Sequence, residues 1–143
     1  MKRELSIVNG GIFYFLSGLL ILKKKMFLQL NHQKLDIYTV SRNFVHECYR
    51  LTKQLPDEER FNLISQIRRA ALSVHLNIAE GCSRKSLGER KRFYEVSRGS
   101  LIEIDAALDV SEDLGYCTKI GLSELGFLMT RVFSMLSKMI TGE

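Results

Sequence analysis

The sequence has few of the residues that form crosslinks, metal sites or long loops. Its 143 residues include three cysteines, one proline and ten glycines. Because Cys48, Cys82 and Cys117 are far apart, they form none of the close pairs that zinc sites and redox motifs require. Their odd number favours a reduced, cytoplasmic protein. With so little proline the chain has no room for long disordered linkers, and its length suits one domain.

Signatures of catalysis are also missing from the sequence. The histidines, His32, His46 and His75, are isolated, and no serine, cysteine or aspartate stands at a spacing that suggests a nucleophile and its base. A phosphate-binding glycine loop is absent. One set of carboxylates at three- and four-residue spacing could bind Mg²⁺ as in all-α nucleotide hydrolases, but those enzymes need further acidic pairs on a facing helix. The set is Asp105, Asp109, Glu112 and Asp113. We therefore expect no enzyme activity, no metal and no other cofactor.

The first 25 residues differ from the rest of the chain. An apolar run at 11–22 lies between Lys2 and Arg3 on one side and three lysines at 23–25 on the other. A transmembrane helix needs about 20 apolar residues, so this run is too short to span a membrane, and the lysines stand where a signal peptide would have its cleavage site. Met26 follows directly. We interpret residues 1–25 as a non-native or disordered extension from an over-extended gene model, and 26–143 as the folded domain.

Apolar and small residues recur in steps of three and four over four segments, which predicts four amphipathic helices. The predicted helices cover about 32–53, 57–80, 86–114 and 118–140. Joined by short loops, they should form an all-α, up-and-down antiparallel four-helix bundle. The predicted core stripes are Ile37, Ser41, Phe44, Cys48, Leu51 and Leu55; Phe61, Ile64, Ile67, Ala71, Val74 and Ile78; Phe93, Ser97, Ser100, Ile104, Ala107, Ser111 and Leu114; and Leu122, Leu125, Met129, Val132, Leu136 and Met139.

The boundaries between these helices carry recognisable signals. Pro56 can stop the first helix and start the second, and Gly81 can supply a left-handed cap at the end of the second. Ser86 and Glu89 have the spacing of a capping box for the third helix, and Thr118 can cap the fourth. The fourth helix and parts of the first are apolar over more than one face, which favours self-association; a thicker core is the alternative.

Positive charge is concentrated around the start of the third predicted helix. Residues 84–98 contain six Lys/Arg and two Glu, whereas the chain as a whole has a net charge of +5. Such a cluster can pair with phosphates and release counterions. A solvated helix face with internal pairs such as Glu89 with Arg92 is the alternative. No base-reading motif accompanies the cluster, so nucleic-acid binding would be driven by the backbone. The candidate binding residues are Arg84, Lys85, Arg90, Lys91 and Arg92.

A second set of polar residues suits a structural role. Arginine heads that pair with carboxylates across a bundle can fix the register of its helices. The predicted polar network comprises Arg68, Arg69, Asn77, Glu80, Arg98 and Glu103.

Several of these residues belong to motifs with a familiar order. QIRRAA at 66–71, NIAEG at 77–81, RGS at 98–100 and LGY at 114–116 resemble bacterial four-helix-bundle proteins encoded in 23S rRNA intervening sequences. The resemblance covers about 30–140, and His75 stands where relatives usually have proline. The resemblance implies a ring-like homo-oligomer, a pentamer, and a relation to the accessory protein of diversity-generating retroelements. That accessory protein resembles a binding partner of nucleic acid and of reverse transcriptase. The family has no settled biochemical activity.

Taken together, the residues and the resemblance favour a non-enzymatic, oligomeric RNA- or DNA-binding accessory or scaffold protein. The alternative is a homo-oligomeric protein-interaction scaffold that does not bind nucleic acid. The sequence does not separate the two.

Overall fold

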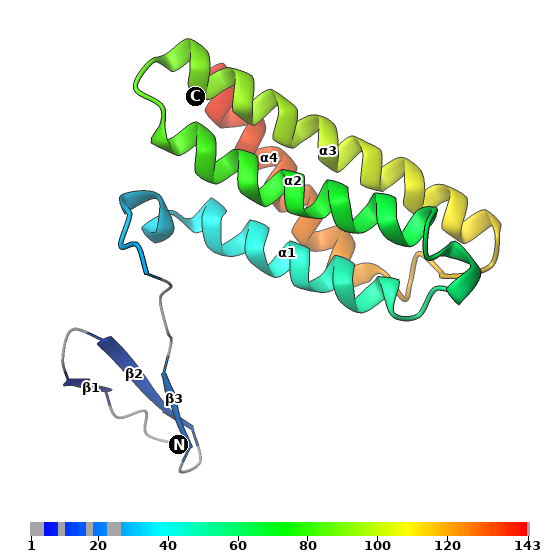
Figure 1. The fold of residues 1–143 in the computed structure, drawn as a ribbon, viewed down its shortest axis with the longest axis horizontal. Helices are drawn as coiled ribbons and strands as arrows, with labels where there is room; N and C mark the ends of the chain where they lie inside the picture. The colour runs from blue at the N-terminus through cyan, green and yellow to red at the C-terminus, as the bar shows by residue number, and fades with distance from the viewer. Residues whose placement is uncertain (1–4, 9–10, 17–18, 23–26, 143) are drawn as a thin grey trace. The chain divides into compact units, whose positions relative to one another are not determined.

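The computed structural model describes residues 5–8, 11–16, 19–22 and 27–142 (Figure 1). The chain divides into two compact units, Met1–Leu30 and Asn31–Glu143. The first unit contains three antiparallel strands in the order β1-β2-β3, in which Leu5 pairs with Tyr14 and Phe13 with Leu22. The strands are β1 (Leu5–Val8), β2 (Gly11–Leu16) and β3 (Leu19–Leu22).

The sequence pattern does not predict strands in this first unit. β-branched and aromatic residues in β2 favour the extended conformation, but the run at 11–22 is apolar throughout and lacks the alternation that marks a strand in a sequence. The predicted translation start at Met26 lies outside the described residues. That 1–25 is a non-native extension stays a prediction.

The second unit is the predicted all-α four-helix bundle. Its α1 packs against α2 and α4, and α3 packs against the same two helices, so α1 and α3 are diagonal to each other. None of the helices in the described part of the chain is long and apolar enough to cross a membrane. The elements are η1 (Asn31–Lys34), α1 (Asp36–Thr52), η2 (Asp57–Glu59), α2 (Leu63–Ser83), α3 (Leu87–Asp113) and α4 (Ser123–Thr141).

The predicted core stripes are mostly buried. All six residues of the first stripe are buried, as are five of the second, with Phe44, Ile67 and Val74 fully enclosed. The prediction is wrong for Phe61, which is 85% exposed, and for Leu114. Both lie outside the α-helices, Phe61 before α2 and Leu114 at the end of α3, so the helical period no longer places them in the core.

Two predicted helix starts also differ from the structure. The turn after Pro56 is a short 3₁₀ helix, and Asn62 (φ −111°, ψ −107°) separates it from α2, which begins at Leu63. Thr118 does not cap α4, because its Oγ1 accepts the Gly121 N–H at 3.1 Å within the connecting turn, and α4 begins five residues later at Ser123.

Gly81 serves packing and not the predicted left-handed cap. It is buried inside α2, which continues to Ser83. A Cβ at this position would lie 2.6 Å from Cε1 of the buried Tyr94 and 3.1 Å from Cβ of Phe93. Glycine is therefore needed here because α3 approaches α2 so closely.

Candidate nucleic-acid interface

The five predicted cations lie where α2 ends and α3 begins. Ser86 caps α3: its Oγ accepts the Glu89 N–H at 3.2 Å and donates to the Glu89 carboxylate at 2.8 Å. The predicted capping function of Ser86 is confirmed. Because only Arg84, Lys85 and Ser86 separate the two helices, this cap also fixes the direction in which the connection runs.

Two of the five cations hold this connection together. The Arg84 guanidinium forms an ion pair with Glu80 and lies over the Phe93 ring, 5.0 Å from its centroid. Arg90 Nε donates to the Arg84 carbonyl oxygen at 2.6 Å. Both side chains are half-buried, so their charge is already committed to closing the turn.

The other three cations are available to a ligand. Lys85, Lys91 and Arg92 have exposed side chains, with no ion-pair or hydrogen-bond partner among the residues that the structure describes. The alternative pair of Arg92 with Glu89 is not formed, and Arg92 does not pair with the nearby Glu95 within that part of the chain either. We call Lys85, Lys91 and Arg92 the turn cations.

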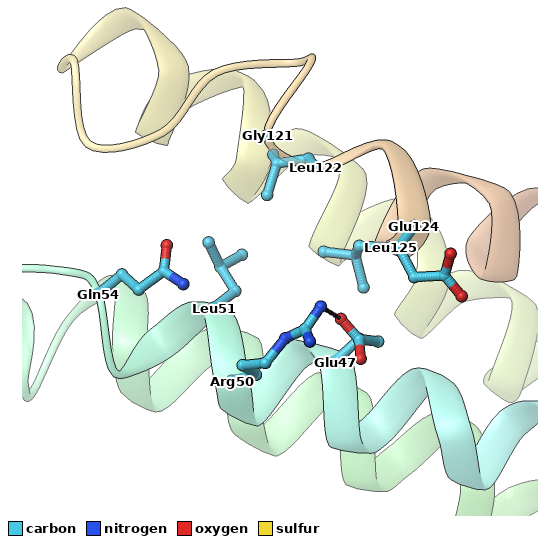
Figure 2. A pocket seen from close by; sticks show the side chains of 8 residues that line it. All are labelled: Glu47, Arg50, Leu51, Gln54, Gly121, Leu122, Glu124 and Leu125. Atoms are coloured by element: carbon cyan, nitrogen blue, oxygen red, sulfur yellow. Dashed lines mark hydrogen bonds and ion pairs between the residues drawn. The ribbon is translucent and has the colours of Figure 1, made fainter.

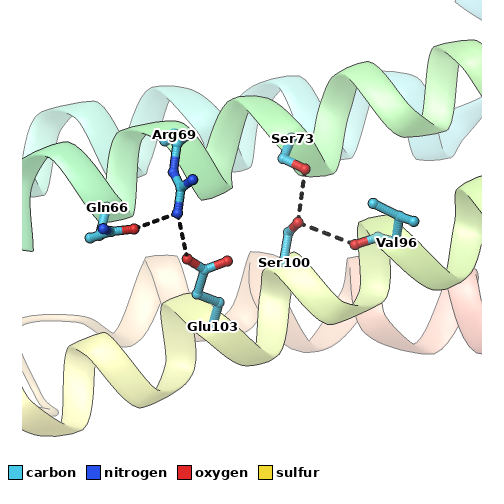
Figure 3. Close-up of polar contacts among 6 residues, drawn as sticks. All are labelled: Gln66, Arg69, Ser73, Val96, Ser100 and Glu103. Carbon is cyan, nitrogen blue, oxygen red and sulfur yellow. Dashed lines mark hydrogen bonds and ion pairs between the residues drawn. The ribbon is translucent and has the colours of Figure 1, made fainter.

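The predicted polar network consists of separate local links. Arg68 Nε donates to Thr52 Oγ1 at 2.8 Å and its guanidinium lies 4.9 Å from the centroid of the Tyr49 ring, which joins α2 to α1. Arg69 joins α2 to α3 through an ion pair with Glu103 at 3.3 Å (Figure 3).

Three other members of the predicted network act within their own neighbourhoods. Asn77 Nδ2 donates to the Ser73 carbonyl oxygen one turn earlier, and Glu80 pairs with Arg84. Arg98 lies over the Phe133 ring of α4, 6.0 Å from its centroid, and has no carboxylate partner among the described residues. Arg68, Arg69 with Glu103, and Arg98 therefore link pairs of helices, whereas Asn77 and Glu80 form contacts within α2 and its end, and the six residues do not form one continuous network.

Serines complete the contact between α2 and α3. Ser97 Oγ donates to the Val74 carbonyl oxygen at 2.8 Å. Ser100 Oγ donates to Ser73 Oγ at 2.9 Å, as Figure 3 shows. These bonds satisfy polar groups that the close approach of the two helices removes from water. The small side chains in the predicted third stripe are thus the surface on which α2 packs.

One serine and histidine pair resembles a catalytic arrangement but is closed to substrates. His75 Nδ1 lies 2.8 Å from Ser41 Oγ, and the Ser41 hydroxyl also donates to the Tyr38 carbonyl oxygen at 3.1 Å. Burial, with smaller contributions from the Arg42, His32 and His46 charges, lowers the pKa of His75. Because Ser41 is fully buried, its hydroxyl cannot reach a substrate.

The pocket between α1 and α4, the buried Cys48 and the distribution of metal-ligating residues do not favour small-molecule chemistry in the described part of the chain. A pocket of about 40 Å³ between α1 and the start of α4 is bordered by the ion pair of Arg50 with Glu47 (Figure 2). Burial raises the pKa of the Cys48 thiol to about 12, so this cysteine is protonated and unreactive. No group of three or more His, Cys, Asp or Glu suited to a metal ion occurs within the described residues.

A second basic surface was missed by the sequence analysis. A shallow groove between α1 and α2 is lined by Val45, His46, Tyr49, Arg50, Lys53 and Leu72. Arg42 lies one helical turn before His46 on the same side of α1. The four- and three-residue spacing of Arg42, His46, Tyr49 and Lys53 is visible in the sequence, but residues 31–56 contain four Lys/Arg and two Asp/Glu, so their net charge does not indicate a basic patch.

The comparisons with known proteins agree with this architecture. The family model described as 23S rRNA-intervening sequence protein matches residues 33–138. The chain belongs to this family. A crystal structure of a protein with unknown function, from the S23 ribosomal protein family of Bacteroides thetaiotaomicron VPI-5482, matches with a TM-score of 0.67 and 21% sequence identity. The match covers 73% of this chain and 97% of that one, and it shows the shared fold. No curated protein matches the chain.

Proposed function

We propose that this member of the 23S rRNA-intervening sequence protein family is a non-enzymatic cytoplasmic homo-oligomer that binds RNA or DNA through the phosphate backbone. The observation that carries the proposal is the availability of the turn cations, which are exposed and unpaired within the described structure. Arg84 and Arg90 hold the turn in place, so the turn cations start from a fixed backbone. Less ordering of the chain on binding leaves more of the interaction energy for affinity.

The chemistry of this surface favours contacts to phosphates over contacts to bases. Lysine and arginine heads pair with phosphate oxygens whatever the sequence of the nucleic acid. The aromatic ring nearest to the turn, Phe93, is half-buried beneath Arg84, and Tyr94 is buried, so neither presents a face for stacking. We therefore expect weak sequence selectivity and a steep dependence on salt.

Repetition of the turn cations would make this modest patch effective. A ring-like pentamer, which the family resemblance implies, would bring several copies of the patch to one side of an assembly. Several linked weak sites bind one polyanion far more tightly than a single site does. Assembly and nucleic-acid binding therefore support each other in this proposal.

The test compares two triple variants of equal charge. In K85Q/K91Q/R92Q the turn cations are neutral; in the control, K34Q/R131Q/K138Q, three exposed cations elsewhere are neutral. Binding of an RNA hairpin and of a DNA duplex is measured by fluorescence anisotropy over a salt series. We expect the first variant to reduce the slope of log K against log salt by about 1 for each phosphate that the protein no longer binds. Equal slopes of log K against log salt in the two variants would refute the proposal that the turn cations form the binding site.

A protein-interaction scaffold remains the second candidate, favoured by the opposite end of the bundle. The α1–α2 and α3–α4 connections meet there, with Tyr116 Oη donating to Glu59 Oε1 at 3.3 Å. Phe61 and Ile120 are 85% and 89% exposed on these connections. An apolar end of this kind suits a protein partner, for instance a reverse transcriptase. Loss of a co-purifying protein in F61S/I120S, together with no salt-dependent binding of RNA or DNA by the unsubstituted protein, would favour this function.

A further inference from the structure

The groove between α1 and α2 combines an apolar floor with a basic rim. Tyr49, Val45 and Leu72 provide the floor, and Leu76, one helical turn beyond Leu72, is 59% exposed. Arg42 and Lys53 lie along the outer side of α1. A contiguous exposed apolar surface with a polar rim is characteristic of a site of protein interaction.

Among the described residues, no carboxylate forms an ion pair with the exposed cations Arg42 and Lys53 of this rim. Arg50 is paired with Glu47 at the edge facing α4, but Arg42, His46 and Lys53 have no ion pair with any described residue. Arg68, on the α2 side, is held by Thr52 and Tyr49 without a carboxylate. The groove therefore requires an acidic, partly apolar partner. We call this surface the α1/α2 groove.

A surface of that chemistry exists on α3 of the same protein. Ile102, Asp105, Asp109 and Asp113 follow one another in steps of three and four and so share one side of the helix. All four are exposed, Ile102 by 57%, and the three aspartates have no hydrogen-bond or ion-pair partner among the described residues. We call these four residues the α3 stripe.

The two surfaces match in length as well as in chemistry. Arg42 on α1 and Lys53, which directly follows this helix, are eleven residues apart, as are Ile102 and Asp113 on α3. At 1.5 Å per residue, each surface extends over about 16 Å of helix. The acidic residues that resembled a metal site in the sequence are thus of the right extent and charge to line the basic groove.

Within one copy the two surfaces cannot meet. α1 and α3 are diagonal in the bundle, each packed against α2 and α4, and both surfaces face outward. We propose that the α3 stripe of one copy docks into the α1/α2 groove of the next copy. This inference rests on the proposed homo-oligomer and names the two surfaces that build it.

The consequence is a head-to-tail assembly. An interface between two different surfaces leaves one of each free after every addition, so it produces a closed ring or an open fibre and never a symmetric dimer. In a closed ring every copy has the same orientation relative to the axis. The turn cations, which lie in neither surface, then recur on one side of the assembly.

Charge reversal tests the pairing of the two surfaces. D105K/D109K and R42E/K53E should each raise the protein concentration needed for half-assembly at least tenfold in sedimentation velocity. The combination of all four substitutions should restore it to within about threefold of the original, because the reversed charges attract again. The control R131E/K138E changes the exposed side of α4 by as much charge and should leave assembly unchanged. Circular dichroism checks that each variant retains its helices.

Disulfide crosslinking tests the head-to-tail arrangement directly. In L72C/I102C, oxidation with copper phenanthroline should produce a ladder of covalent multimers on a denaturing gel, and its last step gives the subunit number. L72C alone and I102C alone should give no ladder, because neither residue would face its own equivalent. The unsubstituted protein controls for Cys82 and Cys117, which are half-buried. A ladder from L72C alone would overturn the proposed interface.

The outcomes separate this inference from the proposed function. An oligomer that neither charge reversal weakens, or one that the fourfold combination fails to restore, refutes the docking of these surfaces and leaves nucleic-acid binding standing. An intact ladder with no effect of K85Q/K91Q/R92Q on binding refutes the binding site and supports the docking. Loss of RNA binding in R42E/K53E with assembly intact would assign the groove to nucleic acid and overturn the proposal.

Discussion

Replacing Gly81 by alanine tests the close approach of α2 and α3, the contact that orients the basic turn. A new Cβ would lie 2.6 Å from Cε1 of Tyr94, a separation at which one of the two groups must move. Tyr94 is buried and its Oη lies 3.5 Å from Cys82 Sγ, so the ring has little freedom to withdraw. The substitution is therefore expected to strain the packing of the two helices.

Two opposing effects set the size of this change. Alanine in a helix interior is more favourable than glycine by about 1 kcal/mol. Forcing an extra methyl group into a packed contact costs about 1 to 3 kcal/mol. The difference between these two contributions predicts that G81A lowers the free energy of unfolding by about 1 kcal/mol, and by at most about 2 kcal/mol.

A matched glycine isolates the packing effect from the helix effect. Gly99 lies inside α3 and is exposed, and apart from its chain neighbours and the backbone of its own helix no described atom lies within 4 Å of the position that a Cβ would take. G99A should raise the free energy of unfolding by up to about 1 kcal/mol. Urea unfolding of both variants at one fixed protein concentration, followed by circular dichroism, gives the comparison. An increase for G81A equal to that for G99A would refute the argument that α3 leaves no room at Gly81.

Two further predictions concern His75 and the helix caps. Burial lowers the pKa of His75 in the folded protein below its ordinary value of 6.5, so the unfolded chain binds this proton more readily as the pH falls. The contribution of neutral His75 to the free energy of unfolding should therefore be fully present above about pH 6.5 and be lost as the pH falls towards the folded pKa. H75Q should flatten this loss in urea unfolding measured at several pH values. Replacing the capping Ser86 by alanine should cost about 1 kcal/mol, whereas T118A, at a residue that does not cap α4, should cost clearly less in the same assay.

Much of the bundle could be predicted because helical period and burial coincide in this sequence. Residues such as Phe44, Ile67 and Val132 recur at the spacing that faces the core, and all are fully buried. The capping box of Ser86 and Glu89 was equally visible, because its effect is local. Helix starts were harder to place: the backbone at Asn62 and the turn around Thr118 depend on how the connections pack at the end of the bundle.

The glycine at the end of α2 shows where sequence reasoning stops. Near a predicted helix end, Gly81 favours a left-handed cap, and only the distance to Tyr94 shows that it instead makes room for α3. A contact between residues thirteen apart on two helices leaves no local signal. The strands β2 and β3 of the first unit are not predicted from the sequence for a related reason, since they are apolar without alternation.

The basic turn illustrates how a uniform cluster in a sequence can separate into two functions. Arg84 and Arg90 resemble Lys91 in type and position, yet one is held by Glu80 and Phe93 and the other by a carbonyl oxygen. A charged side chain that is already paired within the fold contributes less to ligand binding, because binding must first break that pairing.

The same reasoning applies to the carboxylates of α3. Glu103 is used by Arg69, whereas Asp105 and Asp109 on the neighbouring surface are without partners among the described residues. Unpaired charge within the described residues is thus concentrated in three places: the turn cations, the basic rim of the α1/α2 groove and the acidic α3 stripe. The groove and the stripe belong to diagonal sides of the bundle, so a second copy of the chain is the simplest partner that satisfies both.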